Sequence, residues 1–521
     1  MLRKIGQSFA AQFLRLAITF ADRFLVVGVL LRVWGTETYA DWALLGSFAS
    51  LLSLAEVGLN IHYGNVLQKA HVENDSVGFQ RMVSVALGCS AAMGLGVAIS
   101  GLIFITIVDV PRLLSVSHFS HGEALSVLML LGLATISRMM RGAISQIYRG
   151  RQSYARGVVV DVAFMTALIV IMIAAGFTGA GPLTMAILYL IVDGVMGWGL
   201  MQIDLVRRWP ELRFVLAIPT RSELASIARQ VRWLAIQQGT PTAWLQLPVV
   251  LLGVLGATGS ALVSFIILRT LANLARQVSS MLSIASGIEI ANVHYSGRVS
   301  DVARKISLLG RFLSGVSAGI AVWVALYGKP FVAYWSGRDD LFDPTIAAAL
   351  FGAVLITAPF SPIGSLAILA GFPRAAAIAS MVQLAVGLVA CGFLAAAYGV
   401  PGAAIGLALG EAVGVGLALP LLTARHTSLN YLSYLRDCLE AMVLVTVWCL
   451  GVGYLLGFGF SGTGSIVSLL TSTLLWTAFG LLPALVASLP AEQRARTLRA
   501  MREKSAFLLS NAACKYRTNR H

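Results

Sequence analysis

Among the charged side chains inside long apolar stretches of this chain, where a charge is costly, twelve stand out. Six are arginines and six are acids: Arg15, Arg23, Arg138, Arg141, Arg269 and Arg276, and Asp22, Glu56, Asp161, Asp193, Glu289 and Glu411. An arginine or aspartate at the centre of a membrane-spanning helix costs about 2.5 to 3.5 kcal/mol on insertion scales. The pattern therefore predicts that these side chains line a wet cavity or pair with one another.

The leading candidates for an anion site are Arg269 and Arg276. Arg269 lies nine residues into a predicted span, near mid-depth, and Arg276 follows at i+7 on the same helix face, with Asn273 beside it. A guanidinium suits phosphate because its planar fork donates two hydrogen bonds at once. The alternative is a structural ion pair with Glu56 or Asp22.

Six further side chains are candidates for contacting substrate. Arg15 shares one helical face with Asp22, whereas Arg23 is turned aside by about 100°. Arg138 and Arg141 lie near a helix end, where an arginine ordinarily snorkels to the membrane surface. Glutamines in the seventh span suit sugar hydroxyls, although glutamine also joins neighbouring helices. The six are Arg15, Arg23, Arg138, Arg141, Gln237 and Gln238.

Acids at mid-depth suggest coupling to protons or sodium. Asp193 follows Gly181 by twelve residues in the sixth span, and Glu411 follows Gly402 by nine residues in the twelfth. The alternative is that each acid neutralises a neighbouring arginine. The ion-coupling candidates are Asp193, Glu411, Glu56 and Asp22, and no other cofactor is predicted.

Two predicted spans contain paired prolines. Pro241 and Pro248 lie in the seventh span, and Pro359 and Pro362 lie in the tenth. Proline removes a backbone donor and clashes with the preceding turn, so both helices are expected to bend or break. Since transporters place sites and hinges at broken helices, all four prolines are hinge candidates.

The composition indicates a membrane protein. Of the 521 residues, 58% are hydrophobic and 12% are charged, and the mean hydropathy of +0.82 lies outside the range usual for soluble globular proteins. A net charge of +15 would suggest nucleic acid binding in a soluble chain. Here the excess of basic residues in cytoplasmic loops explains it more simply, so no nucleic acid partner is predicted.

The sequence contains no pattern typical of an enzyme or a metalloprotein. Its five cysteines have neither zinc nor disulfide spacing. It has no Ser/His/Asp set and no P-loop. The chain is therefore not expected to be an enzyme, an ATP-driven pump or a metal-binding protein.

The expected fold is all-helical, with about 14 transmembrane helices of roughly 20 apolar residues each. The candidate spans are 10–31, 40–62, 82–107, 123–147, 156–177, 182–205, 231–254, 260–290, 306–328, 345–370, 374–398, 402–424, 437–457 and 464–488. Nearly all arginines and lysines fall in every second gap between these spans. This bias predicts a multi-pass protein with both termini in the cytoplasm.

An internal repeat is expected to divide the chain. Gly150 and Gly181 are 31 residues apart, as are Gly371 and Gly402, and each pair frames one helix between similar turns. Two parallel six-helix lobes would follow, as in transporters whose halves rock around a central site, although Gly and Ala in apolar helices also match by chance. The expected domains are a lobe over 1–206, a basic cytoplasmic linker over 207–230, a second lobe over 231–424, two extra helices over 425–490 and a basic cytoplasmic tail over 491–521.

These features resemble the MOP flippase superfamily, and within it the bacterial polysaccharide or O-antigen flippases of the Wzx type. The resemblance rests on TYADWALLGSFASLLSLAEVGLN at 38–60, on the turns at Gly150 and Gly371, and on the six-plus-six repeat with two extra helices. It implies two pseudo-symmetric lobes in a V around a central cavity that opens to each side in turn. Family cavities often carry arginine or lysine.

The resemblance also implies a location and a substrate. The location would be the bacterial inner membrane. The substrate would be an oligosaccharide on undecaprenyl diphosphate, turned from the cytoplasmic to the outer leaflet for assembly of O-antigen, capsule or exopolysaccharide. Membrane lipids, a polysaccharide polymerase and chain-length proteins are the other expected partners.

Two alternative functions stay open. A cation-coupled multidrug or lipid exporter of the same superfamily would suit a mainly acidic cavity, which six arginines against six acids do not favour. A membrane glycosyltransferase or ligase usually needs an acidic or metal site on a sizeable loop, and the loops here are short.

Overall fold

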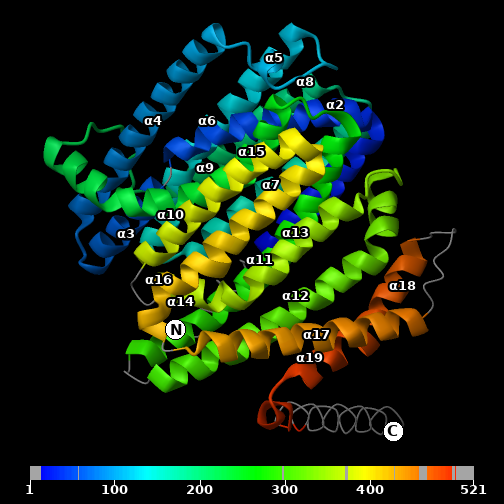
Figure 1. The fold of residues 1–521 in the computed structure, drawn as a ribbon. Helices are drawn as coiled ribbons and strands as arrows, with labels where there is room; N and C mark the ends of the chain where they lie inside the picture. The colour runs from blue at the N-terminus through cyan, green and yellow to red at the C-terminus, as the bar shows by residue number, and fades with distance from the viewer. Residues whose placement is uncertain are drawn as a thin grey trace, which may run out of the picture. The chain divides into compact units, whose positions relative to one another are not determined.

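The computed structural model describes residues 13–495, apart from 57, 296–298, 370–372, 428 and 457–465, together with Arg499. All regular secondary structure in this part of the chain is helical (Figure 1). Ten of its helical segments are long and apolar enough to cross a membrane. The all-helical membrane fold is therefore confirmed, while the count of fourteen spans stays a prediction.

The elements of the first half begin with a helix over 13–21. It continues into η1 (Asp22–Val26), α2 (Val27–Ser50), η2 (Leu51–Glu56), α3 (Leu59–Val72), α4 (Ser76–Ile107), α5 (Val110–Leu113), α6 (His121–Gly150), α7 (Tyr154–Phe177), α8 (Pro182–Tyr189), η3 (Leu190–Met196) and α9 (Gly197–Arg208). The segments η1 and η3 are π-helices, which have a wider turn than an α-helix, and η2 is a 3₁₀ helix.

The second half begins with α10 (Arg221–Val254) and α11 (Gly259–Tyr295). It continues with α12 (Val299–Ser336), α13 (Pro344–Thr357), η4 (Ala358–Phe360), α14 (Ser361–Leu369), α15 (Pro373–Glu411), η5 (Ala412–Ala418), α16 (Leu419–Thr427), α17 (Tyr431–Leu455), α18 (Ile466–Trp476), η6 (Thr477–Leu481) and α19 (Leu482–Ser488). Here η4 is a 3₁₀ helix, and η5 and η6 are π-helices.

The second predicted span, 40–62, is not one continuous helix. The α-helical part ends at Ser50, the 3₁₀ segment η2 follows, and Gly58 has a φ of 88° before α3 begins. A left-handed residue ends a right-handed helix, and glycine adopts this conformation without a Cβ clash. Periodicity alone does not reveal such an interruption, because the apolar residues continue through it.

The four hinge candidates lie in two different settings. Helix α10 stays helical through Pro241 and Pro248. The tenth predicted span instead changes to the 3₁₀ segment η4 at Pro359, and Pro362 lies in the first turn of α14. The tenth span therefore breaks at its prolines and the seventh does not, while movement at any of the four stays a prediction.

Helix α10 starts within the predicted basic linker. Thr220 and Glu223 form a capping box, in which each side chain pairs with the other residue's backbone N–H. This cap starts the helix at Arg221, so the non-helical connection covers only 209–220.

Left-handed turns recur at a nearly constant offset along the chain. Positive φ angles occur at Gly35 and Gly256, at Ser115 and Gly337, and at Gly179 and Gly399. These pairs are separated by 221, 222 and 220 residues, and Gly150 and Gly371 are also 221 apart. The same offset brings the π-helix η3 within one residue of the π-helix η5. The backbone thus supports the repeat that the glycine spacing predicts.

Contacts divide the chain into two compact units. The first contains residues 1–274, 332–350 and 373–414, and the second contains 275–331, 351–372 and 415–521. Helices α11, α12 and α13 therefore each contribute to both units. The predicted boundaries of the two lobes stay a prediction.

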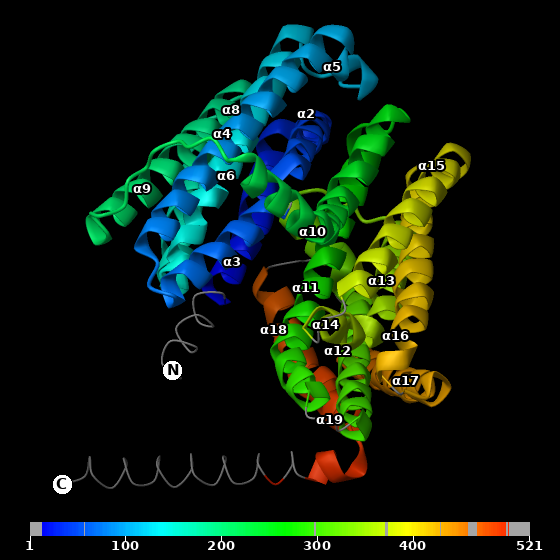
Figure 2. The ribbon, with the colours of Figure 1, turned by 90° about the vertical axis from the view of Figure 1, so that its left-hand side faces the viewer.

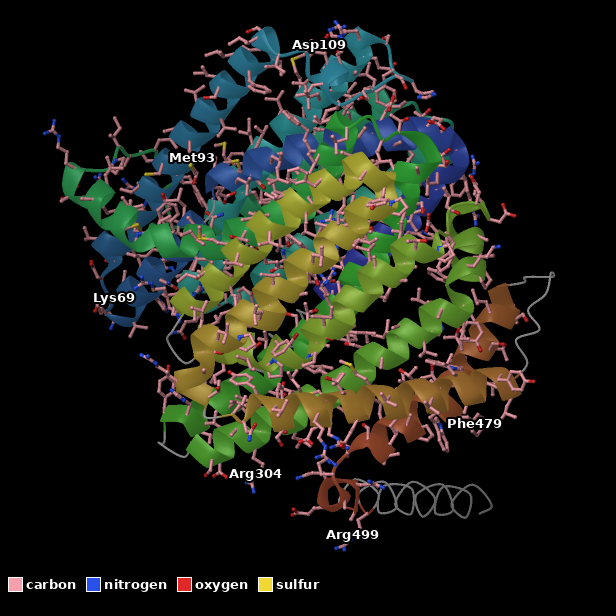
Figure 3. All side chains as sticks on the ribbon, in the orientation of Figure 1. Lys69, Met93, Asp109, Arg304, Phe479 and Arg499 are labelled. Atoms are coloured by element: carbon pink, nitrogen blue, oxygen red, sulfur yellow. The ribbon has the colours of Figure 1, made fainter. Side chains whose placement is uncertain are left out.

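Helix α6 is the centre of the first unit. It contacts α2, α3, α4, α7, α8, η3 and α9, and Figure 2 shows α3, α4, α6, α8 and α9 side by side. Tyr148, Ile144 and Phe164 are among the fully buried side chains of its core. In Figure 3, Met93 lies on α4, Asp109 lies just after its C-terminal end, and Lys69 lies on α3 near its N-terminal end. Helix α10 also packs in this unit, along α15 and against α2 and α3.

The second unit holds the C-terminal helices on α12. Val316, Tyr327 and Trp476 belong to one apolar cluster there. The Trp476 indole Nε1 donates to the Cys449 carbonyl at 3.0 Å, and the Trp323 Nε1 donates to the Thr473 hydroxyl at 3.2 Å. The two extra helices predicted over 425–490 thus pack as part of this unit.

Candidate functional site

A charged cavity of about 450 Å³ lies inside the first unit. Its walls come from the first helix with η1, and from α6, α7, η3 and α9. Five arginines and three aspartates line it: Arg15, Arg23, Arg138, Arg141 and Arg149, and Asp22, Asp161 and Asp193. The formal excess is two positive charges. Of the helices that carry these side chains, α6, α7 and the segment from α8 to α9 are apolar enough to span a membrane.

Asp193 joins two of these arginines. Its Oδ2 accepts from the Nε of Arg138 at 2.9 Å and lies 2.8 Å from the Nη2 of that residue. Its Oδ1 accepts from the Nη1 of Arg141 at 2.9 Å. The carboxylate is 5% exposed. Because both oxygens are paired, the cost of burying the charge is largely offset.

The π-helix η3 supplies further acceptors to α6. The Asp193 carbonyl accepts from Arg141, and the Gly194 carbonyl accepts from the Ser137 hydroxyl at 2.8 Å. Arg141 also lies over the Phe164 ring, with its Cζ 4.1 Å from the centroid, a cation–π contact. Arg141 is buried and does not snorkel.

Arg15 and Arg23 are exposed to the cavity. The Nε of Arg15 is 3.5 Å from the Asp161 Oδ2, too far for a strong hydrogen bond. Arg23 forms no hydrogen bond or ion pair with any other described residue. Arg149 donates to the Asn65 amide oxygen at 2.6 Å. The cavity thus contains guanidinium donors that the described protein groups leave unused.

The structure places Arg15, Arg23, Arg138, Arg141, Asp22 and Asp193 in this one cavity. Arg23 lies in its wall although helical geometry turns it aside from Arg15. The reason is that the helix widens to a π-turn at Asp22, so the angle expected for an α-helix does not apply.

Arg269 has a different setting. It is 4% exposed, and its guanidinium donates to the carbonyl of Trp244 and, at 3.0 Å, to the carbonyl of Leu245. Pro248 has no N–H, so the Trp244 carbonyl lacks its usual partner four residues on. Arg269 replaces that partner. Arg276 is half-buried on the same helix, and a headgroup contact by either residue stays a prediction.

The remaining predicted side chains are spread out. Glu411 is buried. Glu56 lies beside Gly142 of the cavity wall, where a Cβ would come within 2.6 Å of the Glu56 Oε1. This oxygen is buried and has no hydrogen bond from any described residue. The side chains of Gln237, Gln238 and Glu289 lie outside the described residues.

Sequence reasoning missed Tyr189 as part of the site. Its hydroxyl accepts from Arg138, and the Arg138 Cζ lies 5.6 Å from its ring centroid. Tyr189 precedes Asp193 by four residues, a spacing that places both on one helical face. That spacing was the available signal. Among the described residues no group of three His, Cys, Asp or Glu side chains could hold a metal ion.

Comparisons with known proteins identify the fold. No family model matches the chain, and no curated protein matches its sequence. A structure of the lipid II flippase MurJ in an inward closed conformation matches with a TM-score of 0.68 at 13% identity, covering 92% of this chain and 98% of that chain. An inward-facing multidrug resistance MATE family transporter of the MOP superfamily matches with a TM-score of 0.65 at 15% identity, covering 80% and 95%. The chain has the MOP transporter fold.

Other structures with the MOP transporter fold are similar. One is a MOP superfamily transporter from Pyrococcus furiosus, described by the reverse polarity of its binding pocket, with a TM-score of 0.52 at 14% identity, covering 82% of this chain and 94% of that chain. These are transporters and a flippase rather than enzymes. The MOP transporter fold, with its ten apolar helices, makes the chain a multi-pass membrane protein.

The three charged residues around Asp193 have no charged counterparts at the matching positions of the second repeat. At an offset of 221 residues, Arg138 and Arg141 correspond to Pro359 and Pro362, and Asp193 corresponds to Gly414. The cluster is therefore a property of the first repeat alone.

Proposed function

We propose that this protein is a flippase that turns an undecaprenyl-diphosphate-linked oligosaccharide from the cytoplasmic to the outer leaflet of the bacterial inner membrane. The observation that carries the proposal is the set of unused guanidinium donors in the cavity, chiefly on Arg15 and Arg23. Such donors in a cavity among membrane-spanning helices suit a multiply charged anion attached to a lipid, because diphosphate oxygens accept bidentate hydrogen bonds from arginine.

The electrostatics favour a diphosphate over a neutral lipid. Two opposite unit charges 4 Å apart gain about 4 kcal/mol at an effective dielectric of 20. With a formal excess of two positive charges, the cavity can balance a diphosphate.

The net positive charge of the cavity also favours an anionic lipid over the cationic substrates of a multidrug exporter. A lipophilic cation entering among five arginines and three aspartates meets net repulsion. Coverage points the same way: the MATE structure matches 80% of this chain while the MurJ flippase matches 92%. The share of this chain that the MATE structure does not cover is similar in size to the segment from residue 425 to the C-terminus.

Alternating access between the two repeats completes the proposed mechanism. The positive-inside bias places both termini in the cytoplasm, so an inward opening receives the headgroup from that side. Opening to the other side then releases it for O-antigen, capsule or exopolysaccharide assembly, where a polymerase and chain-length proteins would receive it.

For coupling to protons or sodium we favour Glu56 among the four acids. Asp193 is occupied by two arginines. Glu56 instead has a buried oxygen without a hydrogen bond from a described residue, and the buried Asn60 Oδ1 has none either. Both side chains lie against Gly142. Transport in vesicles should depend on the pH or sodium gradient and lose that dependence in Glu56→Gln; transport indifferent to both gradients removes the coupling.

The test of the proposed function is transport of a labelled undecaprenyl-diphosphate oligosaccharide into proteoliposomes. The double variant Arg15→Ala/Arg23→Ala should lower the rate at least about tenfold, since each removes a charge-assisted contact. Arg112→Ala, an exposed arginine outside the cavity, should stay near the wild-type rate. Wild-type transport by the double variant would contradict the assignment, and efflux of lipophilic cations without lipid transport would favour the multidrug alternative.

A further inference from the structure

The carboxylate of Asp193 has no oxygen left for a transported ion. Its Oδ2 serves the Nε and Nη2 of Arg138, and its Oδ1 serves the Nη1 of Arg141, at 2.8 to 2.9 Å. A proton or sodium ion at this carboxylate would compete with the guanidiniums that both oxygens already bind. The geometry is that of a group that holds arginines in place.

The two arginines are held for different purposes. Arg141 has a side chain only 8% exposed and is enclosed by the Asp193 carbonyl and the Phe164 ring. Arg138 has a side chain that is 44% exposed and lines the cavity. Arg141 therefore anchors Asp193 to α6, while Arg138 faces the space where a ligand binds.

Two of the three nitrogens of the Arg138 guanidinium are fixed. Nε donates to Asp193 and Nη2 donates to the Tyr189 hydroxyl. A guanidinium is planar, so two fixed nitrogens also fix the direction of the third. No described residue accepts from Nη1, which leaves its donors for a ligand. The Tyr189 ring centroid lies 5.6 Å from the Arg138 Cζ.

We infer that Asp193 and Tyr189 are positioning residues that aim Arg138 at the phosphate of the substrate. This inference rests on the proposed function and names the part of the cavity that meets the anion. Asp193 and Tyr189 do not touch the substrate themselves. They act by restricting Arg138 to one conformation before the ligand arrives, which removes part of the entropy cost of binding.

The second repeat supports the specificity of this arrangement. Its equivalents of Arg138 and Arg141 are Pro359 and Pro362, and its equivalent of Asp193 is Gly414. The second repeat therefore lacks a charged residue at all three of these positions.

The test compares KM and maximal rate of lipid transport in Asp193→Asn and Tyr189→Phe. We expect Asp193→Asn to raise KM about tenfold and Tyr189→Phe about threefold, with maximal rates within about threefold of wild type and with unchanged dependence on pH and sodium. A double-variant cycle with Arg138→Ala is decisive. If Asp193 acts through Arg138, Asp193→Asn has no further effect on KM once Arg138 is removed.

Three outcomes would overturn the inference. The first is loss of ion dependence in Asp193→Asn with KM unchanged, which would make the residue a coupling group. The second is an additive effect of Asp193→Asn in the Arg138→Ala background. The third applies if Asp193→Asn protein does not accumulate, and it is an unchanged affinity of purified Tyr189→Phe protein for inorganic pyrophosphate. The Arg15→Ala/Arg23→Ala variant reports on the proposed function separately, because neither arginine contacts Asp193 or Tyr189.

Discussion

Gly197 provides the space that the Arg141 guanidinium fills. A Cβ at this position would clash with the Arg141 Nη1. The guanidinium cannot move away freely, because Asp193 holds it through both its carboxylate and its carbonyl. A single methyl group here would therefore disturb the charged cluster without removing any charge.

We expect Gly197→Ala to destabilise the protein by about 1 to 3 kcal/mol through overpacking. Thermal unfolding in detergent measures this loss, and lipid transport should fall with it. Gly199→Ala is the matched control: it lies on the same helix, gains the same helix propensity, and a Cβ there has no atom within 4 Å. Equal stability of the two variants would contradict the close approach of Arg141.

From the sequence, we ordered the arginines as candidate substrate contacts by their depth in the predicted spans. In the structure, what distinguishes them is the group that each guanidinium binds. Asp193 is more than fifty residues from Arg138 and Arg141, so neither spacing nor depth could show that they meet. Arg269 was the leading candidate, yet its partners are the backbone carbonyl of Trp244, which Pro248 leaves without a donor, and the carbonyl of Leu245. Every non-proline residue has such a carbonyl, and only the fold shows which one is left unpaired.

At the scale of the element, Arg269 stabilises α10 where Pro248 interrupts its hydrogen bonds. Arg269→Met should lower the free energy of unfolding by about 1 to 3 kcal/mol, because buried carbonyls lose their donors. In a Pro248→Ala background the loss should shrink by about 1 kcal/mol, since the introduced alanine would donate its own N–H to the Trp244 carbonyl. Denaturation of the four proteins in detergent gives the comparison, and an identical loss in both backgrounds would argue against this role.

The connection over 209–220 is tied to the first unit at both ends. Gln80 exchanges hydrogen bonds with the backbone of Arg213 at 2.6 and 3.1 Å. The Arg81 guanidinium donates to both oxygens of Glu223 at 3.2 and 3.1 Å. Composition predicts this segment as a surface linker, but these contacts hold it along the start of α4.

The tie between Arg81 and Glu223 should weaken in acid. The Arg81 guanidinium, together with the Thr220 backbone N–H, lowers the pKa of Glu223 from 4.5 to about 2. A lowered carboxyl pKa stabilises the fold fully above 4.5, and this contribution is lost as the pH falls toward 2. Glu223→Gln should therefore flatten the dependence of thermal stability on pH between these values. An unchanged profile, with Glu211→Gln as the exposed control, would exclude Glu223 as the titrating group.

Helix positions followed from the apolar runs, because each run is long enough to demand a span. The π-helices at η1, η3 and η5 had no such signal, since a π-turn is set by tertiary packing rather than by composition. They lie where the charged residues are, at Asp22, at Asp193 and directly after Glu411. The charged positions were thus predictable as a set, but the local geometry that brings them together was not.

At the scale of the whole molecule, residues of the two repeats meet at one end of the first unit. The Nη1 of Arg338 donates to the Thr36 hydroxyl at 3.3 Å, and the Trp335 Nε1 donates to the Phe24 carbonyl at 2.6 Å. Arg32 donates to the Tyr334 carbonyl. The charge bias predicts that this end faces the cell exterior.

The alternating access proposed above would require these contacts to open in each cycle. Cysteines at 36 and 338, introduced into a cysteine-free protein, should be joined by an impermeant bifunctional reagent added to whole cells. We expect joining to slow lipid transport at least about tenfold, as for a trapped conformational step, and reduction of a cleavable reagent to restore it. Normal transport in fully joined protein would exclude opening at this end, and the single cysteine at 36 controls for labelling alone.

The constant offset between left-handed turns implies an origin by duplication of a half-sized ancestor. Two identical copies would both have contained the arginine cluster, or both would have lacked it. The present chain has arginines in one copy and prolines at the matching places in the other. In an ancestral homodimer the same residues would have stood at both places, so the two copies have since diverged there. One copy contains the arginine cluster that we propose binds the lipid diphosphate, and the other contains a helix that breaks at its prolines.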